Sequence, residues 1–487
     1  MHTGTFLVGF FIYLGAMLLL SWWVSRSQRS GEDFLLGGRS FPFVLTLGTT
    51  VATMVGTGSS MGAVGFGYAN GWAGALYGLG GAIGILLLAW WFAPARELRF
   101  MTMSEELSYY VGANRTVKNL TALLMFVASI GWLGAHMLGG GLYLAWIAGI
   151  DPALAKTIIA VGFALYVIVG GYTAVVWTDT IQALILFFGF LLMAALALNR
   201  IGGYDNLYAS MDPAAVSWFA IEKIGVWPAL SLAAAVCVGV LGTPSYRQRI
   251  YSGASVGTVR RSFVWSGGIY LLFACVPAVI GMAAHALNPN LDNANFAFPY
   301  LAVEVLPLAA GLIVLLAGLS ATLSSASSDA LAGVSILLRD VYSMATGKMP
   351  PAGKVVLFSR LGLVAVIGVA LIFALLSNDV IGYITKMISM VMSGLFVCGV
   401  LGRFWPRFTW QGAVAALVGA FGASLAVLLN DEWLAALGNP ALPAVGASLA
   451  SGVLGSLASP PSRTTRAEAL AILTAEREQI EGKAPAA

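Results

Sequence analysis

The sequence predicts an all-α integral membrane protein with about 13 transmembrane helices. Of its 487 residues, 59% are hydrophobic and only 9% are charged, whereas roughly 25% of the residues in a soluble globular domain are charged. Thirteen apolar segments approach the roughly 20 residues that a helix needs to cross a bilayer. No long polar block interrupts them, so we expect a single transmembrane domain over residues 1–458 and no sizeable soluble domain.

The apolar segments follow one another along the whole chain. They are 6–24, 42–68, 72–93, 120–148, 154–176, 178–198, 225–245, 262–285, 300–338, 355–377, 380–403, 410–430 and 441–458. No Lys or Arg precedes the first segment and no small-residue cleavage site follows it, so we expect a retained helix and not a signal peptide. Residues 459–487 are expected to form a cytoplasmic tail, with a short helix over 466–477.

The positions of Lys and Arg predict the orientation, because these residues accumulate on the cytoplasmic side of membrane proteins. With the N-terminus outside and the C-terminus in the cytoplasm, 20 of the 25 fall in cytoplasmic segments. Lys156, Arg200 and Lys223 fall outside, and Arg360 and Lys386 fall within spans. We therefore expect a multi-pass protein of the bacterial inner membrane. The cytoplasmic group is Arg26, Arg29, Arg39, Arg96, Arg99, Arg115, Lys118, Arg247, Arg249, Arg260, Arg261, Arg339, Lys348, Lys354, Arg403, Arg407, Arg463, Arg466, Arg477 and Lys483.

Two spans carry unusual runs of hydroxyl side chains. The second span contains Thr49–Ser60, which is rich in Gly, Ser and Thr. Such a run lowers helix propensity and offers carbonyls and hydroxyls at mid-bilayer depth, where an unwound segment is tolerated only beside protein or water. Close packing of helices through small residues is the alternative. The ninth span contains Ser320–Asp329, whose hydroxyls are hard ligands that suit an alkali cation.

Two aspartates lie within or beside these spans. Asp329 belongs to the ninth span, and an ionisable residue inside a membrane helix indicates a function, with a structural pair to Lys or Arg as the alternative. Asp179 and Gln182 follow Gly170-Gly171 at a turn between two spans. Asp179 or Thr178 could also serve only as the N-cap of the next helix.

The order of several motifs resembles that of the sodium:solute symporters, a family that includes proline, pantothenate, sugar and sialic-acid transporters. The resemblance covers about residues 6–405. It rests on Leu36-Gly37-Gly38-Arg39-Ser40, on Gly170-Gly171 with Trp177-Thr178-Asp179 and Gln182, on Gly242-Thr243-Pro244 with Gln248-Arg249, and on Ser324-Ser325 with Asp340-Val341-Tyr342.

The resemblance implies a LeuT-like fold of five plus five helices in inverted repeat. The first repeat would be 42–198 and the second 225–403, with helix 6–24 before them and two helices over 410–458 after them. Binding sites in such folds lie near mid-membrane at broken helices. A sodium site is implied at the carbonyls of Val51, Met54 and Ala321 and the hydroxyls of Ser324 and Ser325.

The resemblance also points to residues for ion coupling and for solute binding. Asp179 matches an aspartate associated with cation coupling. Some relatives carry an acidic residue where this chain has Thr53, and relatives with two sodium ions have a serine where it has Ala321, so one sodium ion is expected. Thr53 and Thr57 are candidates for solute contact.

The eleventh span supplies two further candidates for the solute site. Thr385 matches a position that contributes to the solute pocket of sugar-carrying relatives. Lys386 lies within the apolar run, where its charge is costly. It could meet a carboxylate of the solute, or it could pair with Asp329 or Asp379.

We therefore expect a secondary active transporter, not an enzyme, that couples sodium to uptake of a small polar organic solute by alternating access. An amino acid or a carboxylate is favoured. The alternatives are proton coupling, or a neutral or cationic solute such as a sugar, a nucleobase or a choline-like amine. A respiratory enzyme subunit would need clustered ligands, but His2, His136 and His285 lie in different segments. The expected partners are the solute, sodium and the lipid bilayer, with no cofactor and no nucleic acid, in a monomer or weak oligomer.

Overall fold

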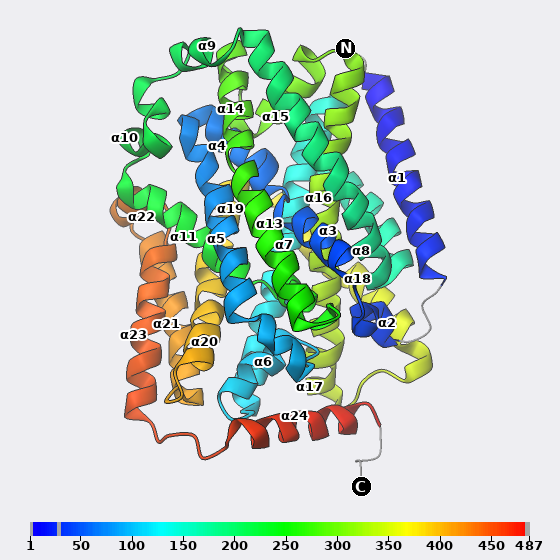
Figure 1. Ribbon diagram of the computed structural model, residues 1–487, viewed down its shortest axis with the longest axis vertical. Helices are drawn as coiled ribbons and strands as arrows, with labels where there is room; N and C mark the ends of the chain where they lie inside the picture. The colour runs from blue at the N-terminus through cyan, green and yellow to red at the C-terminus, as the bar shows by residue number, and fades with distance from the viewer. Residues whose placement is uncertain (1–2, 27–30, 483–487) are drawn as a thin grey trace.

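The computed structural model describes residues 3–26 and 31–482, and in this part of the chain the all-α prediction is confirmed. His2, Arg29 and Lys483, used above, lie outside the described residues. Most helices run along the long axis of the molecule (Figure 1), with α1 at one side of the bundle and α21 and α23 at the other. The described residues form no β-strand and only one isolated bridge, between Phe41 and Gly253.

The helices have the following bounds. They are α1 Thr3–Ser25, α2 Gly31–Leu36, α3 Phe43–Met54, α4 Ala63–Asn70, α5 Ala75–Trp91, α6 Met103–Tyr110, α7 Arg115–Ala148, α8 Pro152–Ile201, α9 Tyr204–Ala209, α10 Ile221–Ile224, α11 Val226–Gly242, α12 Pro244–Ser252, α13 Val256–Phe273, α14 Cys275–Leu287, α15 Ala297–Tyr300, α16 Leu308–Ile336, α17 Ser343–Thr346, α18 Val355–Leu375, α19 Val380–Met387, α20 Ser393–Phe404, α21 Trp410–Leu428, α22 Asp431–Leu437, α23 Ala441–Ala458 and α24 Arg466–Ile480.

Shorter 3-10 and π-helical turns connect several of these helices. The ones used below are η2 Gly58–Gly62, η9 Leu337–Tyr342 and η11 Ile388–Met392. All three are π-helical. The η2 turn leads from the break after α3 into α4.

The count of 13 membrane helices is not confirmed. By length and composition, ten helices in the described residues could cross a membrane, and the bent pair α11–α12 would make eleven. The other two predicted spans correspond to α3, which is too short to cross a membrane alone, and to the first half of α8.

Helix α8 is two antiparallel halves that meet at Gly171. Leu14 and Ser21 of α1 lie against Gly162 and Gly170, so the first half runs parallel to α1. Gln182 then donates a hydrogen bond of 2.9 Å to the hydroxyl of Tyr13, which brings the chain back beside the middle of α1. Gly171 has φ 58° and ψ −172°, a conformation that favours glycine. The reversal therefore lies at Gly171 and not near residue 177, where the apolar pattern placed it.

The second predicted span is broken at its centre. Helix α3 ends at Met54, residues 55–57 leave the helix, and η2 and α4 continue from Gly58 to Asn70. The chain then reverses at Gly71, whose φ is 64°, and Tyr77 of α5 returns to lie against Gly58. Of the two interpretations of Thr49–Ser60, the structure shows the unwound one.

A second broken helix is formed by α11 and α12. The two meet at Thr243-Pro244 with a bend of 45°. Proline lacks the N–H that would continue the α11 ladder, and its ring excludes the preceding turn. Arg247 and Arg249 lie in α12 and are 1% and 0% exposed, so they do not belong to a cytoplasmic loop as the charge pattern suggested.

The C-terminal helix α24 runs across one end of the bundle (Figure 1). Its Leu473 is 1% exposed. Arg477 pairs with Glu105 of α6 at 3.0 Å, and Glu476 pairs with Lys118 of α7 at 2.9 Å. The predicted helix over 466–477 is therefore confirmed, and ion pairs attach it to α6 and to the first turn of α7.

Candidate functional site

A cavity lies beside the break between α3 and η2, with about 440 Å³ of empty space that is partly open to the surroundings. Five elements meet there: the broken segment, α5, α7, the α11–α12 break and α16, with Tyr270 added by α13. The lining residues are Thr53, Met54, Gly56, Gly58, Ser59, Tyr77, Gly81, Trp132, His136, Val236, Val240, Thr243, Ser245, Tyr246, Tyr270 and Asp329. A largely apolar pocket with a few converging polar groups is the usual form of a small-molecule site.

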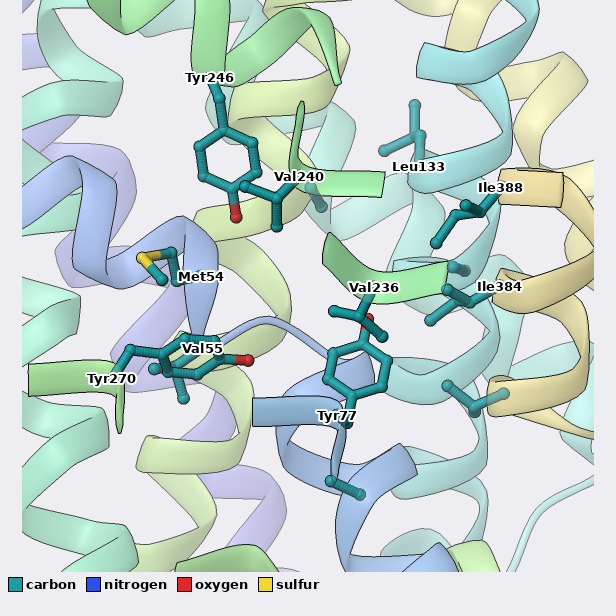
Figure 2. Close-up of a cluster of buried hydrophobic side chains, with 14 of the residues drawn as sticks. Met54, Val55, Tyr77, Leu133, Val236, Val240, Tyr246, Tyr270, Ile384 and Ile388 are labelled. Carbon is teal, nitrogen blue, oxygen red and sulfur yellow. The ribbon is translucent and has the colours of Figure 1, made fainter. Parts of the chain in front are cut away.

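Three tyrosines surround the cavity from three different helices. Figure 2 shows the hydroxyl ends of Tyr77, Tyr246 and Tyr270 pointing toward the space beside Met54 and Val236. Their rings supply apolar surface and their hydroxyls supply hydrogen-bonding groups. The arrangement can therefore hold a solute that has both apolar and polar atoms.

The predicted sodium ligands Ser324 and Ser325 lie against the broken end of α3. Ser324 donates to the carbonyl of Ala52 at 3.0 Å, and Ser325 donates to the carbonyl of Thr53 at 3.0 Å. Both serines are almost fully buried, at 0% and 1% exposure. The two hydroxyls thus meet the carbonyls that the end of α3 leaves without helical partners.

The three predicted backbone ligands lie in the same place. The carbonyl of Val51 accepts from Val55 N–H at 3.1 Å, and the carbonyl of Met54 accepts from the Ser59 hydroxyl at 2.8 Å. The carbonyl of Ala321 accepts from Ser324 at 3.4 Å. The structure therefore gathers all five predicted ligand residues around the α3 break, in contact with α16.

Asp179 lies at the centre of a buried network and is not a helix N-cap. Its Oδ2 accepts from the hydroxyls of Thr49 at 2.7 Å and Ser328 at 3.1 Å. The same oxygen is 3.4 Å from Nη2 of Arg249, and both side chains are 0% exposed. The carboxylate therefore links the second half of α8 to α3, α12 and α16.

Arg249 is the cation of this network. Its Nη2 lies 2.9 Å from the hydroxyl of Thr49 and 2.6 Å from that of Ser328, and it also contacts Thr53, so its two N–H groups are shared among these acceptors. Its Nη1 donates to the carbonyl of Ser245 at 2.9 Å.

The two threonines of the broken segment differ in their surroundings. Thr53 lines the cavity and bonds to Arg249. Thr57 does not line it and is 0% exposed. Its hydroxyl lies 3.0 Å from Nδ1 of His136 and 3.3 Å from the hydroxyl of Thr322. Of the two, only Thr53 is placed for direct contact with a molecule in the cavity.

Neither Thr385 nor Lys386 lines the cavity. Thr385 is buried in α19 and donates to the carbonyl of Ile381 at 3.0 Å. Lys386 has an exposed side chain. The residues of α19 and η11 that approach this region are Ile384, which lies against Gly58, and Ile388, which lies against Gly239. Figure 2 shows both isoleucines on the side of Leu133. A contact of Thr385 or Lys386 with the solute therefore stays a prediction that this cavity does not support.

Asp329 pairs with a histidine and not with Lys386. Its Oδ2 is 3.1 Å from Nε2 of His136, and both residues line the cavity. The ring of Trp132 stacks on that of His136 with 6.3 Å between centroids and 16° between planes. Trp132 in turn donates to the hydroxyl of Thr243 at the α11–α12 break, at 2.9 Å.

The sequence analysis missed His136, Trp132 and the three cavity tyrosines. His136 carried a signal, because a histidine in the middle of an apolar span is costly unless it has a polar partner. The aromatic residues carried none, since tyrosine and tryptophan in a membrane helix also pack against lipid or neighbouring helices.

Comparisons with known proteins place the chain among transporters. Residues 34–419 match the model of the sodium:solute symporter family. A sodium/glucose cotransporter of Vibrio parahaemolyticus is 26% identical over 466 residues, which cover 85% of this chain and 83% of the relative. A sodium/pantothenate symporter of Haemophilus influenzae is 26% identical over 427 residues, with 81% and 85% covered.

Solved structures confirm the LeuT-like fold. A sodium-coupled sialic acid symporter in a substrate-bound outward-open state superimposes with a TM-score of 0.79 at 20% identity, covering 94% of this chain and 99% of that one. A nucleobase-cation-symport-1 family transporter gives 0.59 at 13% identity, with 93% and 99% covered. MhsT in complex with L-phenylalanine gives 0.55 at 14% identity, with 85% and 98% covered.

The Asp179–Arg249 pair predicts a specific pattern of stability. Asp179→Asn or Arg249→Met alone leaves a buried charge without its partner, which costs about 3–5 kcal/mol. Each single variant should therefore lower the melting temperature of the purified protein, and the double variant should recover much of the loss. Lys118→Met with Glu476→Gln, at a pair exposed by 9% and 37%, should change it little. A double variant as unstable as the two losses added together would contradict a direct pairing.

Proposed function

The chain belongs to the sodium:solute symporter family, and from this premise we propose that it couples the sodium gradient to inward transport of a small polar organic solute. It works by alternating access and catalyses no covalent reaction. The solute occupies the cavity beside the α3 break, and sodium occupies the neighbouring site between α3 and α16. Sodium is the one inorganic ion that we propose to bind the protein.

The observation that carries the proposal is the contact between the serines of α16 and the end of α3. Sodium is a hard cation that binds oxygen ligands. Ser324 and Ser325 bring two hydroxyls to carbonyls that have lost their helical partners. In the proposed site, sodium binds the two serine hydroxyl oxygens together with the carbonyls of Val51, Met54 and Ala321. The hydrogen bonds from the serines to Ala52 and Thr53 are then replaced by bonds to the ion.

Coupling follows from the position of this site. The ion bridges α3 and α16, and the residues that follow the end of α3 line the solute cavity. Sodium thereby favours the conformation in which the solute site is formed. A coupling free energy of typically about 1–3 kcal/mol raises solute affinity about 5- to 150-fold, and by linkage the solute raises sodium affinity equally.

Asp179 acts on this site indirectly. The carboxylate bonds to Thr49, one turn before Ala52 and Thr53, and to Ser328, one turn after Ser324 and Ser325. With Arg249, it fixes the separation of α3 and α16 on the inner side of the sodium ligands. We therefore assign Asp179 to positioning of the ion-coupling helices.

The domain organisation proposed is one transmembrane unit over 1–458 with a tail over 459–487. Two repeats, 42–198 and 225–403, each begin with a broken helix, α3–η2–α4 in the first and α11–α12 in the second. Broken helices at matching positions support this division because they meet at the central site of inverted-repeat transporters. Helix 6–24 precedes the repeats and 410–458 follows them.

The protein is proposed to lie in the bacterial inner membrane with its N-terminus outside and its C-terminus in the cytoplasm. Arg247 and Arg249 no longer count toward the loop charges, but the remaining Lys and Arg residues keep a strong excess on the α24 side. Segments rich in Lys and Arg stay on the cytoplasmic side of membrane proteins, so this side is assigned to the cytoplasm.

Uptake by cells or proteoliposomes should depend on sodium and on the serine pair. With Ser324→Ala and Ser325→Ala, the concentration of sodium needed for half-maximal uptake should rise at least tenfold, because two of the five proposed ligands are removed. Ser424→Ala with Ser448→Ala is the matched control, since these buried serines also donate to backbone carbonyls but lie in α21 and α23. Transport that is unchanged when potassium replaces sodium at fixed membrane potential would refute sodium coupling.

The orientation is tested by reporters fused after residue 487. A reporter that is active only outside the cell should stay silent, and one that is active only in the cytoplasm should be active, because the Lys and Arg residues near α24 are retained inside. The opposite result would reverse the orientation of every helix.

A further inference from the structure

The cavity has an unusual charge balance. Among its described lining residues, Asp329 is acidic, His136 is titratable, and neither lysine nor arginine is present. Arg249, one turn from the lining residues Ser245 and Tyr246, is engaged by Asp179. A molecule bound in the cavity therefore meets a carboxylate and no fixed positive side chain.

The two buried aspartates of the central region are neutralised differently. Asp179 has an arginine at 3.4 Å and two hydroxyl donors. Asp329 has one recorded side-chain partner in the described residues, His136, through its Oδ2. Histidine gives this carboxylate a single hydrogen bond, whereas the arginine beside Asp179 is a permanent positive charge. A buried carboxylate in this condition is costly unless a cation joins it.

Aromatic rings surround the space in front of this carboxylate. Trp132, Tyr77, Tyr246 and Tyr270 all line the cavity. The faces of aromatic rings attract cations, tryptophan most strongly. The tyrosine hydroxyls that point into the same space (Figure 2) can accept hydrogen bonds from an ammonium group. An acid next to several aromatic rings is thus suited to a positively charged nitrogen.

We propose that the transported solute is an organic amine whose protonated nitrogen binds Asp329, with its carbon atoms against the aromatic rings and Met54, Val236 and Val240. This rests on the proposed function, in which the cavity is the solute site. It replaces the expectation of a carboxylate held by Lys386, and it retains amino acids as solutes because they carry such a nitrogen.

The test is a thermal-shift screen of the purified full-length protein, with and without sodium. The probes are alkylamines, amino acids, carboxylates, sugars and nucleobases. A ligand that binds the folded state raises its melting temperature. Compounds with a protonated amine should be the ones that stabilise the protein in sodium. A panel in which amines give no shift, or in which an acid or a neutral compound gives the largest one, would overturn the proposal.

Variants separate the role of Asp329 from a structural one. Asp329→Asn should weaken binding of the stabilising amine at least tenfold. Asp340→Asn is the matched control, since Asp340 lies in η9, accepts from Thr102 and does not line the cavity. Without any solute, Asp329→Asn should keep or raise the melting temperature, because it removes the cost of burying a carboxylate that has no arginine or lysine partner. A fall as large as that of Asp179→Asn would show that the pair with His136 is structural and would overturn the proposal.

The screen also distinguishes a failure of amine recognition from a failure of sodium coupling. Amine binding that is equal with and without sodium would contradict sodium coupling and leave amine recognition intact. Sodium-dependent binding of an acid or a sugar would support sodium coupling and contradict amine recognition.

Discussion

The structure depends on one constraint, that a peptide group within a bilayer must find a hydrogen-bond partner inside the protein. Helix α3 stops at mid-span and leaves carbonyls without the N–H groups of a following turn. Ser324 and Ser325 of α16 donate to two of them, and Ser59 donates to a third. Three of these groups, the two serine hydroxyls and the carbonyl of Met54, also belong to the proposed sodium site. Part of what makes the break tolerable in the membrane is therefore what the ion would use.

Buried charge is handled in two ways in the same region. Asp179 and Arg249 neutralise each other and bond to hydroxyls of α3 and α16, so they hold helices together. Among the described residues, Asp329 has one side-chain partner, His136, and it lines the cavity. In the first arrangement each charge has its counter-charge within the protein, although Oδ1 of Asp179 and Nε of Arg249 have no hydrogen-bond partner among the described residues. In the second, the proposed amine nitrogen of the solute would supply the counter-charge.

The sequence contained much of the fold and part of the site. The hydroxyl run at Thr49–Ser60 left a broken helix and close packing through small residues as alternatives. The resemblance to the family is what placed Ser324 and Ser325 beside the break. The sequence could not show that the chain reverses at Gly171 or that Arg249 is buried. Hydropathy does not distinguish a buried helix that carries charges from a loop. Hydropathy also could not show which way Lys386 faces, because a charge in an apolar run can be exposed or buried, and here the side chain is exposed.

The central claim is that the α3 break and the serines of α16 together form a sodium site. Equilibrium binding of radioactive sodium to the purified protein tests it without knowledge of the solute. The account predicts saturable binding of about one ion per chain, as expected for a site with alanine at position 321, and loss of that binding in the Ser324→Ala and Ser325→Ala double variant. Binding of equal affinity and stoichiometry in the double variant would contradict it.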